Sequence, residues 1–250
     1  MNETKTLALL SDIHGNLTAL EAVLADLDRL GVANMVCLGD VAVFGPQPAA
    51  VLDRLQVLAI PVVMGNTDAW LLDPQPHPER DEQTNFINEV ELWGAAQITA
   101  VHRQFLQTFQ PIITISLAAD VEVLCYHGSP RSYDDIIQAM TPDEDLAKFL
   151  AGHTATVLAG GHTHAQLVRR FHQSWLVNPG SVGVPHEFTP DGTIRRPHGA
   201  EYGLVRWENG RITIQLHRVP YNTRRVAEIT RASGMPHTDR WLANWGHEKT

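Results

Sequence analysis

The residues best suited to chemistry are polar side chains that directly follow short apolar runs. Asp12 and His14 flank Ile13 just after the apolar run of residues 6–10. In an extended backbone, alternate side chains point the same way, so the carboxylate and the imidazole are expected to converge while Ile13 turns to the core. A carboxylate oxygen beside an imidazole nitrogen suits a borderline divalent ion such as Mn, Fe or Zn better than Ca. By itself, an Asp between a strand and a helix is more often an N-cap or turn residue.

The same arrangement recurs four more times along the chain. Glycines beside the polar residues allow sharp turns and a close approach of the side chains. The further groups are Gly39-Asp40, Gly65-Asn66-Thr67-Asp68, His127-Gly128-Ser129 and Gly161-His162-Thr163-His164. The carboxyl ends of strands in an open α/β sheet form the crevice that holds ligands, so five such groups indicate one shared site. Asp68 is an exception, because its position before a helical segment predicts a helix cap near residue 69.

The elements that must position these groups alternate between strand and helix patterns. Apolar residues at helical spacing predict helices over residues 17–30 and 48–58, and short apolar runs predict strands at 35–38 and 60–64. The elements predicted downstream are a helix within 95–109, a hairpin with arms 112–116 and 121–126, a helix from 142 to about 151, strands at 156–160, 167–171, 175–177, 202–207 and 212–216, and a helix over 222–232.

The predicted fold class is α/β: a four-layer α/β/β/α sandwich of two stacked mixed sheets flanked by helices, with a C-terminal helical extension. One domain over residues 1–250 is expected, with its core at 6–218 and the extension at 219–250, because this length supports one substantial core. The Pro-rich, acidic segment 73–94 is predicted to be a loop or lid over the site. An irregular surface loop would have the same composition.

Charge and composition exclude several kinds of protein. A formal net charge of -9 disfavours stable nucleic-acid binding, which requires clustered Lys and Arg. No apolar run approaches the roughly 20 residues of a membrane helix, and no basic segment begins a signal peptide, so a cytoplasmic protein without a membrane partner is expected. Cys37 and Cys125 lie in apolar runs and are predicted to be reduced core thiols. Trp241 and Trp245 in the extension could pack on the body or on a second subunit as a homo-oligomer.

The ordered set of polar groups resembles the calcineurin-like metallophosphoesterase superfamily, and most closely its small bacterial and archaeal phosphodiesterase-like members. The resemblance covers roughly residues 6–218, and the matching positions of that family bind two metal ions. It implies two divalent ions per chain, with Mn favoured and Fe, Zn, Co or Ni as alternatives. The implied ligands of the first ion are Asp12, His14, Asp40 and His164, and those of the second are Asp40, Asn66, His127 and His162.

The resemblance implies a hydrolase of phosphate ester bonds, and more narrowly a phosphodiesterase acting on small phosphate esters. Asp40 would bridge two ions about 3.5 to 4 Å apart, so that a metal-bridging hydroxide attacks phosphorus. Asp40, Asn66 and His127 are thereby implied to act in catalysis through metal and phosphate positioning. The alternatives are a phosphomonoesterase or nucleotide pyrophosphatase, a non-catalytic binding scaffold on the same fold, and a single-metal protein that binds a small anion.

Thr67 departs from many superfamily members, which carry a His directly after the metal-binding Asn. A threonine is no strong acid, and general acid catalysis is typically worth about 10² to 10⁴ in rate, so esters with good leaving groups are favoured. In the loop 185–198, His186 and Arg195 are predicted to contact the substrate phosphate, and the loop could supply a replacement acid. A purely solvated loop is the competing interpretation. The segment 178–181 is predicted to form a turn that supports the ligand loops.

Overall fold

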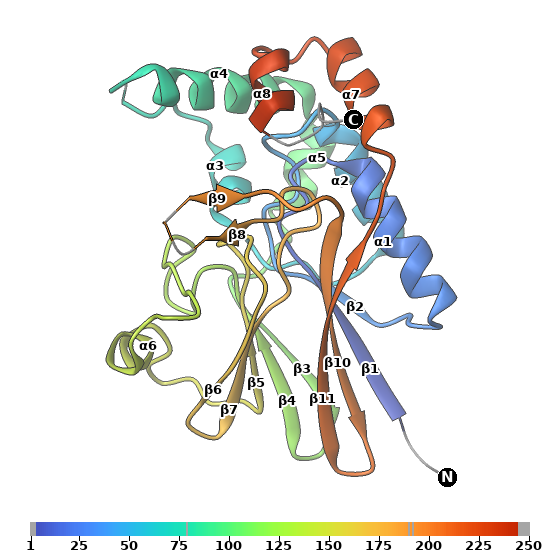
Figure 1. The fold of residues 1–250 in the computed structure, drawn as a ribbon, viewed down its shortest axis with the longest axis vertical. Coiled ribbons are helices and arrows are strands. Elements are labelled where there is room, and N and C mark those ends of the chain that lie inside the picture. The colour runs from blue at the N-terminus through green and yellow to red at the C-terminus, as the bar shows by residue number, and fades with distance from the viewer. Residues whose placement is uncertain (1–3, 79, 190, 192, 245–250) are drawn as a thin grey trace.

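Two β-sheets face each other at the centre of the computed structural model, which describes residues 4–78, 80–189, 191 and 193–244 (Figure 1). The first sheet has the strand order β11 (Arg211–Val219), β10 (Ala200–Glu208), β1 (Thr4–Leu10) and β2 (Met35–Cys37). The second has the order β3 (Ile113–Ala118), β4 (Val121–Cys125), β5 (Val157–Ala159), β7 (Ser174–Asn178) and β6 (Leu167–Phe171). The predicted α/β class with two stacked mixed sheets is confirmed.

The central strands are buried on both faces, which explains their uninterrupted apolar sequences. Along β1, Leu7 and Leu9 pack between the two sheets, whereas Ala8 and Leu10 pack against the helices. This strand pairs in parallel with β2 and antiparallel with β10. The prediction of a strand over residues 60–64 is wrong. Only isolated bridges form there, from Cys37 to Val62 and from Val63 to Gln110.

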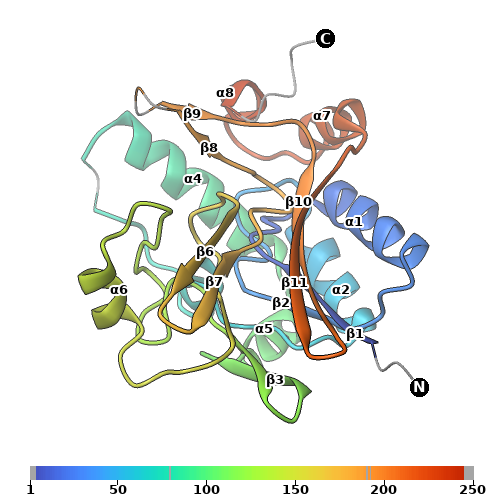
Figure 2. The same cartoon turned by 60° about the horizontal axis from the view of Figure 1, so that its bottom comes forward.

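Helices cover the outer face of each sheet (Figure 2). On the first sheet lie α1 (Leu17–Arg29), α2 (Pro48–Leu58), α3 (Asn66–Leu72) and α5 (Ala100–Leu106), whose apolar side chains share one core with it. On the second lies α6 (Asp143–Phe149). The start of α1 is fixed by Asn16, whose side-chain oxygen accepts a hydrogen bond from the Ala19 N–H at 3.1 Å. The parallel strands, β1 and β2 in the first sheet and β4, β5 and β7 in the second, end on the side of the molecule where the ligand loops lie (Figure 1). Strands β3, β6 and β10 run the opposite way.

The segment 73–94 was expected to be a loop, and this expectation is wrong for its second half. Helix α4 (Glu82–Gln97) begins after Asp81, whose carboxylate accepts from the Thr84 N–H at 2.8 Å. The helix buries polar Asn88 and Glu91 among its apolar residues. These two polar residues interrupt the apolar stripe from which an amphipathic helix is recognised in sequence.

The C-terminal extension packs on the body of the same chain. Helices α7 (Thr223–Ala232) and α8 (Thr238–Asn244) form a cluster with α4 in which Trp241 is fully buried. Trp245 lies outside the described residues. The predicted homo-oligomer stays a prediction. Cys37 and Cys125 are buried free thiols, as expected, and none of the helices in the described ranges is long and apolar enough to cross a membrane.

Candidate metal centre

Two loops with predicted donors lie side by side at the ends of β1 and β2. The backbone N–H of Asp12 donates to the Gly39 carbonyl at 2.9 Å, and that of His14 donates to the Asp40 carbonyl at 3.0 Å. Asp12, His14 and Asp40 have positive φ angles of 54°, 47° and 56°. The extended backbone expected over residues 12–14 is therefore wrong. A left-handed turn, which is sterically unfavourable outside glycine, aims these side chains instead.

The loop after β5 has the same backbone character. His162 and His164 have φ angles of 67° and 58°, so five of the ten described non-glycine residues with positive φ are predicted metal ligands. Only a glycine fits directly before them, because a Cβ on Gly161 would lie 2.0 Å from Ser11 Oγ and 2.9 Å from Asp12 Oδ2. Strained backbone of this kind concentrates at functional sites, where the surrounding fold must hold it.

Main-chain carbonyls orient three of the four predicted imidazole ligands. A carbonyl only accepts, so each bonded Nδ1 carries the hydrogen, and Nε2 of the neutral ring presents a free lone pair. This tautomer is the one that coordination through Nε2 requires. The three bonds, of 2.7 to 2.9 Å, run from His14 to Val43, from His127 to Leu38 and from His164 to Val184.

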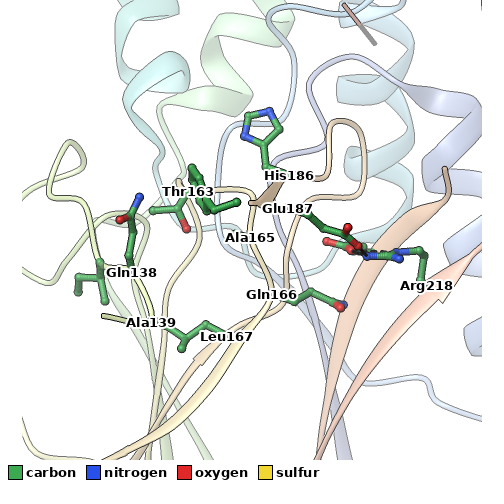
Figure 3. A pocket seen from close by; sticks show the side chains of 12 residues that line it. Gln138, Ala139, Thr163, Ala165, Gln166, Leu167, His186, Glu187 and Arg218 are labelled. Atoms are coloured by element: carbon green, nitrogen blue, oxygen red, sulfur yellow. Dashed lines mark hydrogen bonds and ion pairs between the residues drawn. The ribbon is translucent and has the colours of Figure 1, made fainter. Parts of the chain in front are cut away.

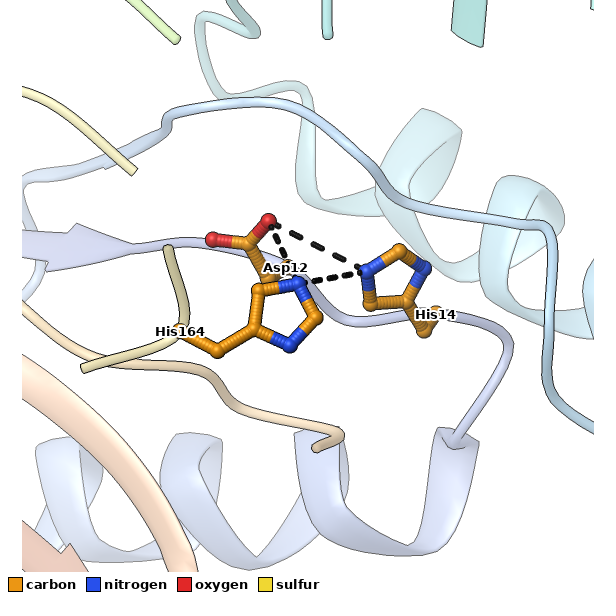
Figure 4. A group of neighbouring side chains, drawn as sticks. All are labelled: Asp12, His14 and His164. Carbon is orange, nitrogen blue, oxygen red and sulfur yellow. Dashed lines mark hydrogen bonds and ion pairs between the residues drawn. The ribbon is translucent and has the colours of Figure 1, made fainter. Parts of the chain in front are cut away.

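The first cluster consists of Asp12, His14 and His164 (Figure 4). Asp12 Oδ1 lies 3.3 Å from His164 Nε2 and 3.9 Å from His14 Nε2. The two Nε2 atoms lie 3.0 Å apart, although their residues are 150 positions apart in sequence. With both hydrogens on Nδ1, two lone pairs face each other at this distance. Only a proton or a cation between them relieves the repulsion.

Asp12 supplies a further sign that the first cluster fits a metal ion. Its Oδ2 accepts hydrogen bonds from the Ser11 hydroxyl at 2.6 Å and from the His162 N–H at 3.1 Å. Its Oδ1 is buried and has no hydrogen-bond partner among the described residues. Buried polar atoms are normally paired, so an unpaired carboxylate oxygen beside two imidazole lone pairs fits a borderline divalent ion.

The second cluster consists of Asp40, His127 and His162, whose ligand atoms lie within 4.8 Å of one another. His127 Nε2 lies 3.5 Å from Asp40 Oδ2 and 3.1 Å from Asn66 Oδ1. The Asn66 amide oxygen therefore faces the same point as the cluster. The structure brings together all four side chains that the sequence assigns to the second ion.

Asp40 lies between the two clusters. Its Oδ1 accepts from the Thr67 N–H at 3.0 Å, which fixes the carboxylate plane. Its Oδ2 lies 3.8 Å from His14 Nε2 and 3.5 Å from His127 Nε2, one histidine from each cluster. This oxygen can thus serve two ions at once, as the predicted bridging role requires.

Burial and charge oppose each other at the donors. Burial disfavours the charged forms of Asp12 and Asp40, but the surrounding histidines outweigh it and hold the pKa of both carboxyls below the ordinary range. Burial and the nearby His164 lower the pKa of His14 to about 4. At His127 the carboxylates of Asp40 and Asp12 outweigh burial and raise the pKa to about 10. The site therefore offers two ionised carboxylates, and a bound cation must displace a proton from His127.

Asp68, a buried carboxylate outside the ligand set, holds two ligand loops together. It accepts hydrogen bonds from the N–H groups of Asp40 at 2.7 Å, Val41 at 3.0 Å and Gly65 at 3.1 Å. The bond to Gly65 confirms the predicted capping role, although α3 starts at Asn66 rather than near residue 69. No sequence pattern signals the other two bonds. They join loops that are 27 and 28 positions apart.

The turn at residues 178–181 supports two further ligand loops, as predicted. The Asn178 amide donates to the Gly161 carbonyl at 2.7 Å, directly before the His162 ligand. The Ser181 hydroxyl donates to the Asp12 carbonyl at 2.7 Å. The turn therefore ties the loop after β5 to the loop after β1.

Comparison with known proteins identifies the family. Residues 6–195 match the family described as the calcineurin-like phosphoesterase superfamily domain, which is well over half of the chain. The chain belongs to the calcineurin-like phosphoesterase superfamily. Together with the two His/Asp clusters, this membership assigns the chain to the metal-dependent phosphoesterases. The resemblance inferred from the strand-end groups is confirmed.

Similarity to individual known proteins extends over nearly the whole chain. The uncharacterized protein MJ0912 of Methanocaldococcus jannaschii is 27% identical over 255 residues, covering 94% of this chain and 95% of that protein. The crystal structure of a metallophosphoesterase from Sphaerobacter thermophilus superposes with a TM-score of 0.71 at 25% identity, covering 97% of this chain and 100% of the other. The crystal structure of the hypothetical protein PH1004 from Pyrococcus horikoshii OT3 has a TM-score of 0.80 at 18% identity, covering 98% of this chain and 99% of the other. At this identity the similarity shows the fold alone.

In the present structure, a cavity of about 290 Å³ is lined by residues of both clusters. Five predicted ligands contribute to it, so a substrate here would contact the metal donors directly. No pattern in the sequence signals its apolar walls, which come from the loop after β2, from α4 and from Val184 after β7. Besides the ligands, the residues that line it include Phe44, Phe86, Ile87, Val184, His186 and Arg196.

Arg196 and His186 bring unpaired nitrogen atoms to this cavity. Burial lowers the pKa of Arg196, its Nε is buried without a hydrogen-bond partner, and no described carboxylate forms an ion pair with it. Burial and the charges of His164 and Arg196 lower the pKa of His186 to about 3, so its ring is neutral. Arg195, the predicted phosphate contact, is exposed and donates from Nε to Glu187 at 2.8 Å, away from the residues that line the cavity.

A larger cavity of about 470 Å³ adjoins the first at His186 (Figure 3). None of the predicted metal ligands lines it. Its one arginine, Arg218, is already bonded to both Glu201 and Glu187 at 2.7 Å, so carboxylates outnumber cations there and the cavity is unfavourable for a phosphate. We therefore assign the reacting phosphate to the smaller cavity, where the donors and the unpaired arginine meet.

Proposed function

We propose that the chain is a two-metal phosphodiesterase that hydrolyses small phosphate esters. The observation that carries this proposal is a pair of cavities that diverge from Asn66 and Thr67. The cavity of about 290 Å³ extends toward Phe86 and Arg196, and a second of about 230 Å³ extends toward His77. A phosphate held at the metal donors would thus have room for one ester arm on each side. A monoester has only one arm.

The seven predicted ligands would hold the two ions, with Asp40 shared between them. Bound ions would lower the pKa of a water molecule and neutralise charge on the phosphoryl oxygens. Asp12 and Asp40 stay ionised for this purpose, and the carbonyl-bonded histidines keep Nε2 available. The neutral amide of Asn66 supplies an oxygen without adding negative charge. His186 offers its free Nε2 to the substrate as a neutral group.

The test is a direct comparison of a diester with a monoester that shares its leaving group. The metal-stripped protein is reloaded with Mn, Fe, Zn, Co or Ni and assayed with bis(4-nitrophenyl) phosphate and with 4-nitrophenyl phosphate. We expect kcat/KM for the diester to exceed that for the monoester by about 10-fold or more with the best ion. A preference for the monoester would indicate the phosphomonoesterase alternative, and metal binding without turnover of either ester would indicate the scaffold.

Replacing Arg196 by Gln is expected to raise KM for the diester by about 10- to 100-fold. A hydrogen bond to a charged group is worth about 1.5 to 3 kcal/mol, and no carboxylate among the described residues pairs with Arg196 in competition with a substrate phosphate. The matched control is Arg195→Gln, because this neighbouring arginine is exposed and already bonded to Glu187. Steady-state kinetics distinguish the two variants. Equal KM values for the two variants would contradict phosphate binding by Arg196. The predicted phosphate contact would then have to come from another residue of the loop 185–198.

A further inference from the structure

The cavity of about 230 Å³ contains a histidine that is held unusually firmly for a half-exposed side chain. The backbone N–H of His77 donates to Asn88 Oδ1 at 2.7 Å, and its carbonyl accepts from Asn88 Nδ2 at 2.9 Å. Its ring stacks on Trp70 with an interplanar angle of 14°. Prolines at positions 76 and 78 stiffen the backbone on both sides. The position of this imidazole is therefore fixed before any ligand arrives.

A buried carboxylate orients the same ring. His77 Nε2 lies 2.9 Å from Glu91 Oε2. The Glu91 side chain is only 6% exposed, whereas that of His77 is 48% exposed. Burying a carboxylate is costly unless it is paired, and nothing in the metal centre uses Glu91. With Nε2 bonded to Glu91, Nδ1 is the nitrogen left for a ligand, and no described residue bonds to it.

The His77–Glu91 pair lies beside the reacting centre. Its cavity is also lined by the metal ligand Asn66 and by Thr67, which donates its backbone N–H to Asp40. Thr67 occupies the position at which many superfamily members carry a histidine, and its buried hydroxyl has no hydrogen-bond partner in the described part of the chain. The charge of Asp40 is among the influences that raise the pKa of Glu91, which places Glu91 within electrostatic reach of the site.

We propose that His77, oriented by Glu91, is the general acid that protonates the leaving oxygen of a diester whose leaving arm occupies this cavity. The proposal rests on the proposed phosphodiesterase function. It assigns the two cavities different roles: the retained arm lies against Phe86, and the departing arm lies against His77. The acid thus comes from the segment that precedes α4 rather than from position 67.

The proton and electron balance of this step is simple. A water molecule attacks phosphorus and releases one proton to solvent, the bond from phosphorus to the leaving oxygen breaks, and its electron pair stays on that oxygen. The hydrogen on Nδ1 of the His77 imidazolium moves to the leaving oxygen, which departs as an alcohol or phenol. The neutral imidazole then recovers a proton from solvent. The Glu91 carboxylate keeps the ring oriented throughout and does not itself transfer a proton.

The test measures how the loss of rate depends on the leaving group. His77→Gln and the wild-type protein are compared on methyl 4-nitrophenyl phosphate and methyl phenyl phosphate. A good leaving group needs little protonation, so we expect a loss of less than about 5-fold for the nitrophenyl ester and about 100-fold for the phenyl ester. Glu91→Gln should change the rates in the same direction. Metal content and the dissociation constant of inorganic phosphate should stay at wild-type values in His77→Gln.

The control variant is His172→Gln, an exposed histidine in the turn between β6 and β7, which should leave both rates unchanged. An equal loss for both esters in His77→Gln would overturn the general-acid role while leaving the proposed function standing. No loss for either ester would do the same. If the wild-type protein hydrolyses neither diester with any metal, the proposed function fails, and the role of His77 fails with it.

Discussion

Replacing Asp40 by Asn is expected to lower kcat for a diester by at least about 10³-fold and to weaken the binding of both ions. Asp40 Oδ2 is the oxygen that lies near one histidine of each cluster, at 3.8 Å and 3.5 Å. Asparagine keeps the shape and can still accept from the Thr67 N–H, but it removes the negative charge that two cations would share. Metal ions contribute several kcal/mol to such reactions, and each 1.36 kcal/mol is a tenfold change in rate.

Thermal unfolding separates this loss from a folding defect. Ions at about 100 times their dissociation constant stabilise a protein by about 2.7 kcal/mol per site, or roughly 5 to 10 °C in Tm for a chain of this size. We expect manganese to raise the Tm of the wild-type protein by such an amount and to raise that of Asp40→Asn by far less. The metal-free variant should unfold below the wild-type temperature, because it loses the attraction between the Asp40 carboxylate and His127, a loss only partly offset by relief of repulsion with Asp12 and Asp68. The two proteins are therefore compared by the shift in Tm that manganese causes in each.

A matched control for Asp40→Asn is Asp53→Asn, which alters an exposed carboxylate paired with His102. This variant should keep both its activity and its Tm response to manganese. An Asp40→Asn protein that binds two ions with wild-type affinity, measured by titration calorimetry, would contradict the bridging role.

Replacing Asp68 by Ala is expected to lower the free energy of unfolding by about 3 to 5 kcal/mol, even in the absence of metal. The substitution leaves three buried N–H groups without their acceptor, and each unpaired buried group costs about 1 to 3 kcal/mol. Partial relaxation of the loops reduces the sum. Metal affinity should fall as well, because the loops that carry Asp40 and Asn66 lose their common anchor. Urea unfolding of the metal-free protein measures the first effect directly.

Asp81 provides the comparison for Asp68→Ala. It also caps a helix, accepting from the Thr84 N–H, but it is exposed and bonds within the first turn of α4 instead of joining two loops. Asp81→Ala should cost about 1 kcal/mol and leave metal binding unchanged. If Asp68→Ala were no more harmful than Asp81→Ala, the bonds from Asp68 to Asp40 and Val41 would contribute little.

Sequence reasoning grouped the candidate donors because each follows a short apolar run, although the run before Asn66 forms only isolated bridges. Polar residues beside glycines at strand ends form a local pattern, and neighbouring strands bring them to one end of the sheets. The reason given for the convergence of Asp12 and His14 was nonetheless wrong. Their left-handed backbone depends on hydrogen bonds to the loop of Gly39 and Asp40, which lies about 27 positions later.

Helix α4 shows where a sequence pattern becomes uninformative. The helix buries Asn88 and Glu91, so its polar and apolar residues do not separate onto two faces. These buried polar groups bond to His77, which lies outside the helix. Similarly, Arg195 and Arg196 are adjacent and chemically identical. Only the fold turns one toward Glu187 and the other into the cavity.

The sequence by itself determined the candidate metal donors and their order along the chain, because residue type and position at the end of an apolar run are local properties. Tertiary structure decided how those atoms are aimed: which carbonyl holds each Nδ1, which N–H groups Asp68 accepts from, and which arginine and histidine reach the cavities. These features depend on contacts between distant residues, such as the bond from His127 to Leu38, 89 positions away. Such contacts produce no periodic pattern in the sequence, so they can be identified only in the folded structure.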